Sequence, residues 1–164
     1  MSDSAKVAVI GIGNDYRHDD AVGLEVARRV RQAGVDQAVV VLGVSDDFAL
    51  HTAWQDSGVA YVVDCTESGR PPGTIVRFEA VDEPIPAEIF NSLSTHTLSL
   101  PRAIELSRSL GGLPRGLTIF GIEGTDMSPG RGLTAAVEAA ASRVAEMIVL
   151  SCVGSLHARA ITAD

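Results

Sequence analysis

The sequence VAVIGIGN at residues 7–14, followed by DDAVG at residues 19–23, decides the fold. Its opening apolar run is rich in β-branched residues, which is typical of a strand buried on both faces. The glycines after the run mark a turn, and either Asp19 or Asp20 can cap the helix that follows. That helix is predicted to end near Ala33. The order strand, turn, helix is the first half of a parallel βαβ unit.

Strands and helices continue to alternate along the chain, which predicts a mainly parallel sheet with right-handed crossovers. We expect an α/β protein with a single three-layer domain over residues 1–154, in which a twisted, mostly parallel sheet of about five strands lies between helices. Residues 155–164 lack periodicity and are expected to form a loose C-terminal tail. The further elements are predicted at residues 38–42 (buried strand), 46–58 (helix), 59–63 (strand), 74–80 (edge strand), 96–110 (helix), 117–121 (strand) and 133–152 (helix).

The composition excludes several classes of protein. Of the 164 residues, 13 are basic and 21 acidic, so the net charge is -8 and binding to nucleic acid or an anionic membrane is not expected. No stretch approaches the roughly 20 apolar residues of a membrane span. The two cysteines, Cys65 and Cys152, show neither a pairing pattern nor zinc-ligand spacing. A cytoplasmic, reducing location is therefore expected.

Acidic residues follow two strands that are predicted to be neighbours in the sheet. In open α/β sheets, ligands bind beyond the carboxyl ends of the strands, where the strand order reverses. If the order begins 2-1-3, Asp19 and Asp20 lie at one side of that point and Asp64 at the other. Two carboxylates that face one crevice repel each other unless a cation or proton lies between them. This placement predicts a metal site.

Each of these residues also has a structural interpretation. Capping of the first helix would account for Asp19 or Asp20, and Asp64 could cap the loop after its strand. A small buried apolar residue is the favoured interpretation of Cys65 over a ligand. His96 follows Ser-Thr at a predicted helix start, where a histidine taken alone is more often structural. The other histidines, His18, His51 and His157, are expected at the surface.

A nucleotide site is a weaker interpretation. The dinucleotide fingerprint G-x-G-x-x-G requires a third glycine where Tyr16 stands, and no acidic residue ends the second strand at Leu42-Gly43. Walker, nucleophile-elbow and H-E-x-x-H motifs are not found in the sequence.

Four segments, taken in order, resemble the hydrogenase maturation endopeptidases, the nickel-dependent proteases that trim the large subunit of [NiFe] hydrogenases. They are Gly11-Ile12-Gly13-Asn14, Asp19-Asp20-Ala21-Val22-Gly23, Val62-Val63-Asp64 and Thr95-His96. The late segments at residues 117–123 and 132–134 are similar to the family's last strand and the start of its final helix. The resemblance spans about residues 7–150 and implies a phosphorylase/hydrolase-like fold.

The resemblance also implies a site and a reaction. The family's metal ligands correspond to Asp20, Asp64 and His96, which are the expected catalytic and metal-binding residues. The first of these is often glutamate in relatives, so Asp20 is shorter by one methylene. The implied reaction is one cut near the C-terminus of a [NiFe] hydrogenase large-subunit precursor, after nickel is installed. The nickel is then carried by the substrate, and other divalent ions can occupy the site of the isolated protein.

One segment departs from the family pattern. After the second strand, relatives commonly have two glycines followed by threonine, whereas this chain has Leu42-Gly43-Val44-Ser45-Asp46-Asp47. Replacement of a glycine by Val44 would alter a backbone that needs positive φ or close approach to a peptide. It therefore affects substrate recognition more than metal binding. The alternative function is a non-catalytic nickel-checking or binding module for hydrogenase assembly.

Overall fold

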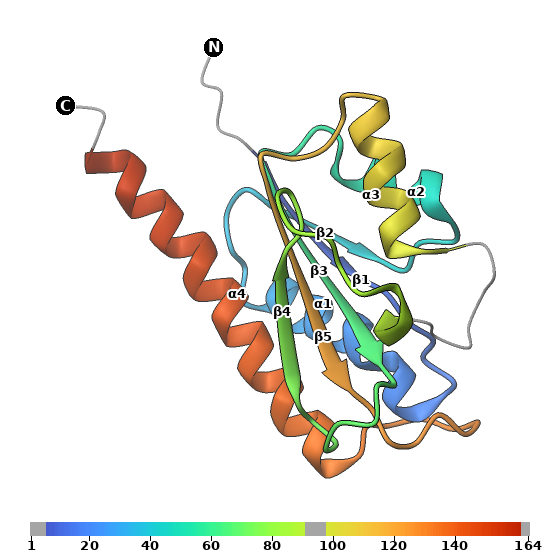
Figure 1. Cartoon of the computed structure of the whole chain (residues 1–164). Helices are drawn as coiled ribbons and strands as arrows, with labels where there is room; N and C mark the ends of the chain where they lie inside the picture. Colours follow the sequence, from blue (N-terminus) through green and yellow to red (C-terminus); the bar gives the residue numbers. More distant parts are fainter. Residues whose placement is uncertain (1–5, 91–97, 162–164) are drawn as a thin grey trace.

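The computed structural model describes residues 6–90 and 98–161, which form a single α/β domain (Figure 1). Its sheet has five strands in the order β2-β1-β3-β5-β4. All neighbouring pairs are parallel except β4 and β5, which are antiparallel. The strands are β1 (Val7–Gly11), β2 (Ala38–Leu42), β3 (Val59–Thr66), β4 (Ile75–Glu79) and β5 (Gly116–Glu123).

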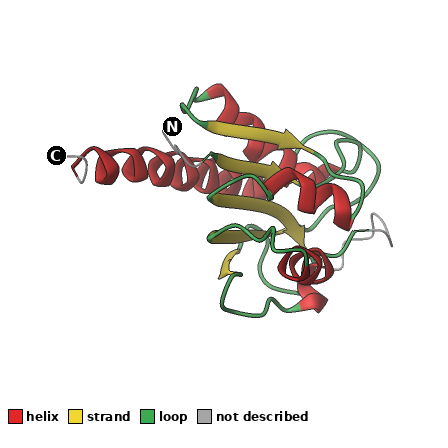
Figure 2. Ribbon diagram, turned by 90° about the horizontal axis from the view of Figure 1, so that it is seen from above, coloured by secondary structure: helices red, strands yellow, loops and turns green. Residues whose placement is uncertain are grey.

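Helices cover both faces of the sheet and give the three layers that the sequence predicts. On one face, α1 (Val22–Gln32) and α4 (Ala135–Ile161) pack against apolar side chains of the central strands. On the other face, α2 (Asp47–Trp54) and α3 (Leu100–Ser109) form a second core with the short helix η2 (Ala87–Phe90). Figure 2 shows this separation from above, with α4 extending past the sheet.

The order of the first three strands is 2-1-3, as the sequence predicts, so the reversal point lies between β1 and β3. Their alignment pairs Gly11 with Val63, and therefore Asp64 follows directly beyond the end of β1. The valines at every fourth position of α1 are buried, and Gly34 follows this helix with a φ of 65°. The sequence periodicity thus places the reversal point correctly.

Several details differ from the predictions. The strand β2 is an edge strand, so its side chains are mostly half-buried. The final helix continues to Ile161, so residues 155–161 are helical where a loose tail was predicted. His51 is not a surface residue, because it is buried between α2 and α3, where its Nδ1 lies 2.9 Å from the hydroxyl of Ser107. The same hydroxyl accepts a hydrogen bond from Nε1 of Trp54.

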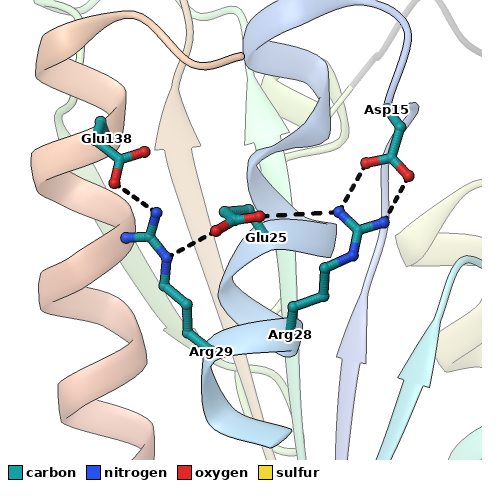
Figure 3. A network of polar contacts seen from close by, with 5 residues as sticks. All are labelled: Asp15, Glu25, Arg28, Arg29 and Glu138. Atoms are coloured by element: carbon teal, nitrogen blue, oxygen red, sulfur yellow. Dashed lines mark hydrogen bonds and ion pairs between the residues drawn. The ribbon is translucent and has the colours of Figure 1, made fainter. Parts of the chain in front are cut away.

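A chain of ion pairs ties the loop after β1 to both helices of one face (Figure 3). Arg28 of α1 donates two hydrogen bonds to Asp15 in that loop, at 2.8 and 2.5 Å. Arg29 donates to Glu25 of its own helix and to Glu138 of α4. The loop is thereby fixed relative to α1 and α4.

Within the described ranges, no helix combines the length and the apolar character needed to cross a bilayer.

Candidate active site

Three glycines of the opening motif allow the backbone to pack tightly at the reversal point. A Cβ on Gly23, in the first turn of α1, would lie 2.2 Å from the carbonyl oxygen of Val63 and 2.3 Å from that of Ile12. A Cβ on Gly11 would lie 2.3 Å from the carbonyl oxygen of Gly23. Only glycine permits this contact between α1 and the ends of β1 and β3. The spacing of the motif therefore reflects packing that brings the start of α1 to the end of β3.

The short helix η1 (His18–Ala21) carries Asp20 to this point. Gly13 has a φ of 151°, and a Cβ there would lie 2.0 Å from the carbonyl oxygen of Asp20. The same carbonyl oxygen accepts a hydrogen bond from the N–H of Asn14 at 3.2 Å. In Figure 1, η1 lies beside the tip of β3, and the two elements are in contact. Asp20 is therefore fixed next to the end of β3.

The side chain of Asp20 is 5% exposed, and its buried Oδ2 has no hydrogen-bond partner among the described residues. Burial raises the pKa of Asp20, the positive charge of Arg17 opposes this rise, and the negative charge of Glu67 adds to it. A buried polar atom without a partner costs free energy, and most such atoms in native proteins are paired. This oxygen is therefore a candidate ligand atom.

Asp64 is the second acidic residue at the reversal point and is 4% exposed. Its Oδ1 accepts a hydrogen bond from the N–H of Cys65 at 2.7 Å. Burial raises the pKa of Asp64 well above its ordinary value, the hydrogen bond opposes the rise, and the charge of Asp20 adds to it. Two desolvated carboxylates that repel each other favour a proton or a cation between them.

Asp19 has a structural role, although it does not cap the first helix. It is fully buried, and its carboxylate accepts hydrogen bonds from the N–H groups of Thr125, Asp126 and Thr134 at 2.8–3.0 Å. The hydroxyl of Thr134 donates to it as well. Neither Asp19 nor Asp20 caps α1, whose N-cap residue is Ala21. Asp19 instead holds the connection between β5 and α4 against η1.

Cys65 is a packing residue, as the sequence indicates. It is 2% exposed and belongs to the core beneath α1 and α4. Burial raises the pKa of its thiol, and the charge of Asp64 adds to the rise. A protonated thiol is a poor metal ligand and a poor nucleophile.

Glu123, at the end of β5, was not identified as a functional candidate from the sequence. It is 2% exposed and accepts hydrogen bonds from the hydroxyls of Thr66 and Ser68 and from the N–H groups of Ser68 and Gly69, all at 2.7–2.8 Å. With these donors its carboxylate is well satisfied, so it anchors the loop after β3. In the sequence, Glu123 is marked as a candidate only by being an acidic residue at the end of a buried strand.

His96, the third predicted ligand, lies outside the described residues. Within the described part of the chain, no three side chains of His, Cys, Asp or Glu are grouped so that they could hold a metal ion. The described part of the site is therefore a pair of acidic residues, Asp20 and Asp64. The segments that flank His96 are η2 on one side and α3 on the other.

Comparison with known proteins identifies the family. The sequence model described as hydrogenase maturation protease matches residues 55–151. This chain belongs to the hydrogenase maturation protease family. It is 26% identical over 147 residues to the hydrogenase 2 maturation protease of Escherichia coli strain K12, and the match covers 88% of each chain. Membership makes the chain a peptidase, a hydrolase that acts on peptide bonds.

Solved structures of this family share the fold. The hydrogenase maturating endopeptidase HybD from E. coli has a TM-score of 0.75 and 25% identity, with 92% of this chain and 93% of that chain covered. A maturation protease HycI from Thermococcus kodakarensis has a TM-score of 0.63 at 20% identity, with 90% of this chain and 92% of that chain covered. At 20% identity, the similarity to the T. kodakarensis structure supports a shared fold only.

The segment that departs from the family pattern has a structural explanation here. Positive φ occurs at Gly43, with a φ of 74°, and not at Val44, which packs against the core beneath α2 and α3. Asp46 caps α2 by accepting a hydrogen bond from the N–H of Ala49 at 2.8 Å. Asp47 accepts hydrogen bonds from the N–H of Ser99 at 2.5 Å and from Arg102 Nε at 2.8 Å. Both acidic residues thus fix the starts of helices in this hydrogenase maturation protease.

Proposed function

We propose that this hydrogenase maturation protease is a nickel-dependent endopeptidase that removes the C-terminal extension of a [NiFe] hydrogenase large-subunit precursor after nickel insertion. The observation that carries the proposal is the pair of buried carboxylates at the reversal point. Oδ2 of Asp20 has no partner among the described residues, and Asp64 is desolvated beside it. A cation would relieve the repulsion and satisfy the free oxygen.

The donor set fits a divalent ion supplied by the substrate. Asp20, Asp64 and His96 would offer two carboxylates and an imidazole, and this set accepts several divalent ions without selecting nickel by affinity. Three protein ligands leave positions open for substrate thiolates or water. Burial keeps the thiol of Cys65 protonated, so Cys65 does not supply a thiolate ligand. The isolated protein should therefore bind divalent ions loosely.

In this proposal the chain's own residues bind and orient the precursor. The carboxylates of Asp20 and Asp64 hold the precursor's metal centre at the carboxyl ends of β1 and β3 and thereby fix the scissile peptide. Nickel in this position can place the peptide, polarise its carbonyl or activate a water molecule. The partner is the precursor itself, and the free thiols of Cys65 and Cys152 agree with a reducing, cytoplasmic setting.

The test compares the cognate precursor with and without nickel. We expect one cleavage of the nickel-loaded form, seen by mass spectrometry as loss of the C-terminal extension, and no cleavage of the nickel-free form. Equal cleavage of both forms would contradict nickel dependence. Binding of the nickel-loaded precursor without cleavage would favour the non-catalytic binding module instead.

A metal titration tests His96 separately. Replacement of His96→Ala should weaken the binding of nickel, cadmium or zinc to the isolated protein, and His157→Ala should leave the titration unchanged. Identical titration curves for the wild type and His96→Ala would remove His96 from the site. A stoichiometric ion that survives chelation would contradict a metal carried by the substrate.

A further inference from the structure

A groove lies between α3 and the segment that follows β4, away from the acidic pair. It has a volume of about 480 Å³ and is lined by residues 80–85 on one side and by Pro101, Ile104, Glu105 and Arg108 of α3 on the other. These α3 residues recur at three- and four-residue intervals, so they lie along one side of the helix. The groove therefore follows the helix for about 10 Å, at 1.5 Å per residue.

The floor of the groove is apolar and well packed. Ala80 is 1%, Ile104 4% and Ile85 8% exposed, and the apolar lining is completed by Val81, Pro84 and Pro101. The side chain of Arg108 bridges the two walls, because its Nη2 donates to the carbonyl oxygen of Val81 at 3.2 Å. The groove therefore has an apolar floor and two walls that share this hydrogen bond.

The rim is acidic. Asp82, Glu83 and Glu105 are exposed around the apolar floor, and among the described residues of the lining only Arg108 is basic. Arg108 is paired with Glu105 at 3.4 Å, which leaves Asp82 and Glu83 as a negative edge. A lysine or arginine side chain fits such a surface, because its methylene stem can lie on apolar groups while its charged end meets carboxylates in water.

The groove begins beside the start of β5, where the N–H of Ala80 donates to the carbonyl oxygen of Leu117, whereas the acidic pair lies at the carboxyl ends of β1 and β3. The walls of the groove belong to the two stretches that flank residues 91–97 in the chain: the segment from β4 to η2 before them, and α3 after them. In Figure 1, the chain between β4 and η2 passes beside α3. Only a partner as large as a protein would contact both the acidic pair and this groove.

We propose that the groove is a docking site for a basic, apolar segment of the precursor, in which a lysine or arginine lies over Ile85 and Ile104 and pairs with Asp82 and Glu83. This proposal rests on the proposed function, since it assumes that a protein precursor is the substrate. It adds a contact that determines affinity without taking part in the cleavage itself. The net charge of -8 favours the same kind of partner.

Charge reversal in the groove tests the proposal. The double variant Asp82→Lys/Glu83→Lys should raise KM for the nickel-loaded precursor about tenfold, which corresponds to about 1.4 kcal/mol, and leave kcat within about twofold. The matched control is Asp36→Lys/Asp56→Lys, which makes the same change of charge at exposed residues outside the groove. An unchanged KM in the groove variant, or an equal rise in the control, would overturn the proposal.

A cross-linking experiment identifies the docked segment without any need for cleavage. Benzoylphenylalanine introduced at position 84 should cross-link the precursor at one segment that contains lysine or arginine beside apolar residues, and the same probe at position 36 should not. Cross-links at many sites, or at a segment without a basic residue, would reject the proposal. If the wild type binds the precursor but never cuts it, the proposed function fails while this experiment still tests the groove.

Discussion

The carboxylate of Asp19 accepts hydrogen bonds from both the backbone N–H and the hydroxyl of Thr134, at 2.8 and 3.0 Å. The two residues belong to η1 and to the connection that enters α4, so one buried side chain joins the first and last parts of the fold. Oδ2 of the neighbouring Asp20, in contrast, has no hydrogen-bond partner in the part of the chain that the structure describes. Adjacent acidic residues of one motif thus have different roles, because Asp19 organises the loops and Asp20 remains available to a ligand.

Replacement of Asp19→Ala should lower the free energy of unfolding by about 2–4 kcal/mol, because it leaves several buried N–H groups without an acceptor. Thr134→Val removes the hydroxyl only and should cost about 1 kcal/mol. Urea unfolding measures both values. Asp126→Ala, which removes a half-buried carboxylate that accepts hydrogen bonds only within the same loop, from Ser128, is the control. Similar losses for Asp19→Ala and Asp126→Ala would contradict the role of Asp19.

The two helical glycines, Gly23 and Gly154, should respond in opposite ways to alanine. Gly23→Ala places a methyl group 2.2 Å from the carbonyl oxygen of Val63, so we expect a loss of about 3 kcal/mol or more. Gly154 has no heavy atom within 4 Å of a Cβ, and alanine there should stabilise the helix by about 0.5–1 kcal/mol. Thermal unfolding of both variants tests the pair, and a stable Gly23→Ala protein would refute the packing argument.

The sequence predicts the sheet well because the central strands are buried on both faces and read as continuous apolar runs. The reversal point and the acidic residues beside it follow from that pattern and from the glycines at 11, 13 and 23. The sequence does not predict the end of α4, because residues 155–161 have no apolar periodicity and the helix extends past the sheet (Figure 2).

The sequence could not separate the roles of the acidic residues, because partners that are distant in sequence decide them. The role of Asp19 differs from that of Asp20 because Asp19 accepts hydrogen bonds from Thr134, which is 115 residues away in the sequence. Glu123 becomes an anchor through Thr66, 57 residues earlier. His51 was predicted at the surface and is buried because Ser107 of α3 supplies a partner for its ring. Such long-range hydrogen bonds leave no local signal.

The stability supplied by Glu123 should depend on pH. Burial opposes the shift, but the hydrogen bonds from Thr66 and Ser68 and from the Gly69 N–H together lower the pKa of Glu123 from its ordinary 4.5. The carboxylate therefore contributes stability above about pH 4.5, and this contribution is lost as the pH falls through the folded-state pKa. Glu123→Gln should be less stable than the wild type at pH 7 by about 1–3 kcal/mol, with a smaller difference at lower pH.

Urea unfolding at several pH values between 3 and 7 checks this expectation, as far as the protein remains folded. Glu88→Gln changes an exposed residue of η2 and should show little difference from the wild type throughout. A constant difference between Glu123→Gln and the wild type across the range would mean that its charge does not matter.

Asp47 should protect the start of α3 from local unfolding. Its carboxylate accepts a hydrogen bond from the N–H of Ser99, the N-cap residue of that helix. Asp47→Ala should speed amide hydrogen exchange at Ser99 by at least about tenfold, since local opening then costs at least about 1.4 kcal/mol less. Arg102→Ala keeps this acceptor and serves as the control. Unchanged exchange at Ser99 in Asp47→Ala would show that the contact does not hold the helix start.

Replacement of either acidic residue at the reversal point, Asp20 or Asp64, should lower the cleavage activity without lowering the stability of the fold. Burial, together with the charge of Asp20, raises the pKa of Asp64, so the ionised side chain lowers the stability of the folded state as the pH rises above 3.8. Asp64→Asn keeps the shape and an oxygen that can accept from the Cys65 N–H. At pH 7 it should therefore be at least as stable as the wild type. Its cleavage of the nickel-loaded precursor should fall about 100-fold or more, because even groups that only support metal ligands change activity 10–100-fold.

Asp20→Asn should likewise lose activity and keep its stability. Cys65→Ala should instead lose stability and keep most of its activity. The buried thiol of Cys65 only packs, so its removal should cost about 1–2 kcal/mol of stability and leave most of the activity. Unfolding and cleavage measured side by side on these variants give the comparison. An active Asp64→Asn protein would exclude Asp64 as a ligand. Loss of activity that follows loss of stability in every variant would mean that the pair serves the fold and not the reaction.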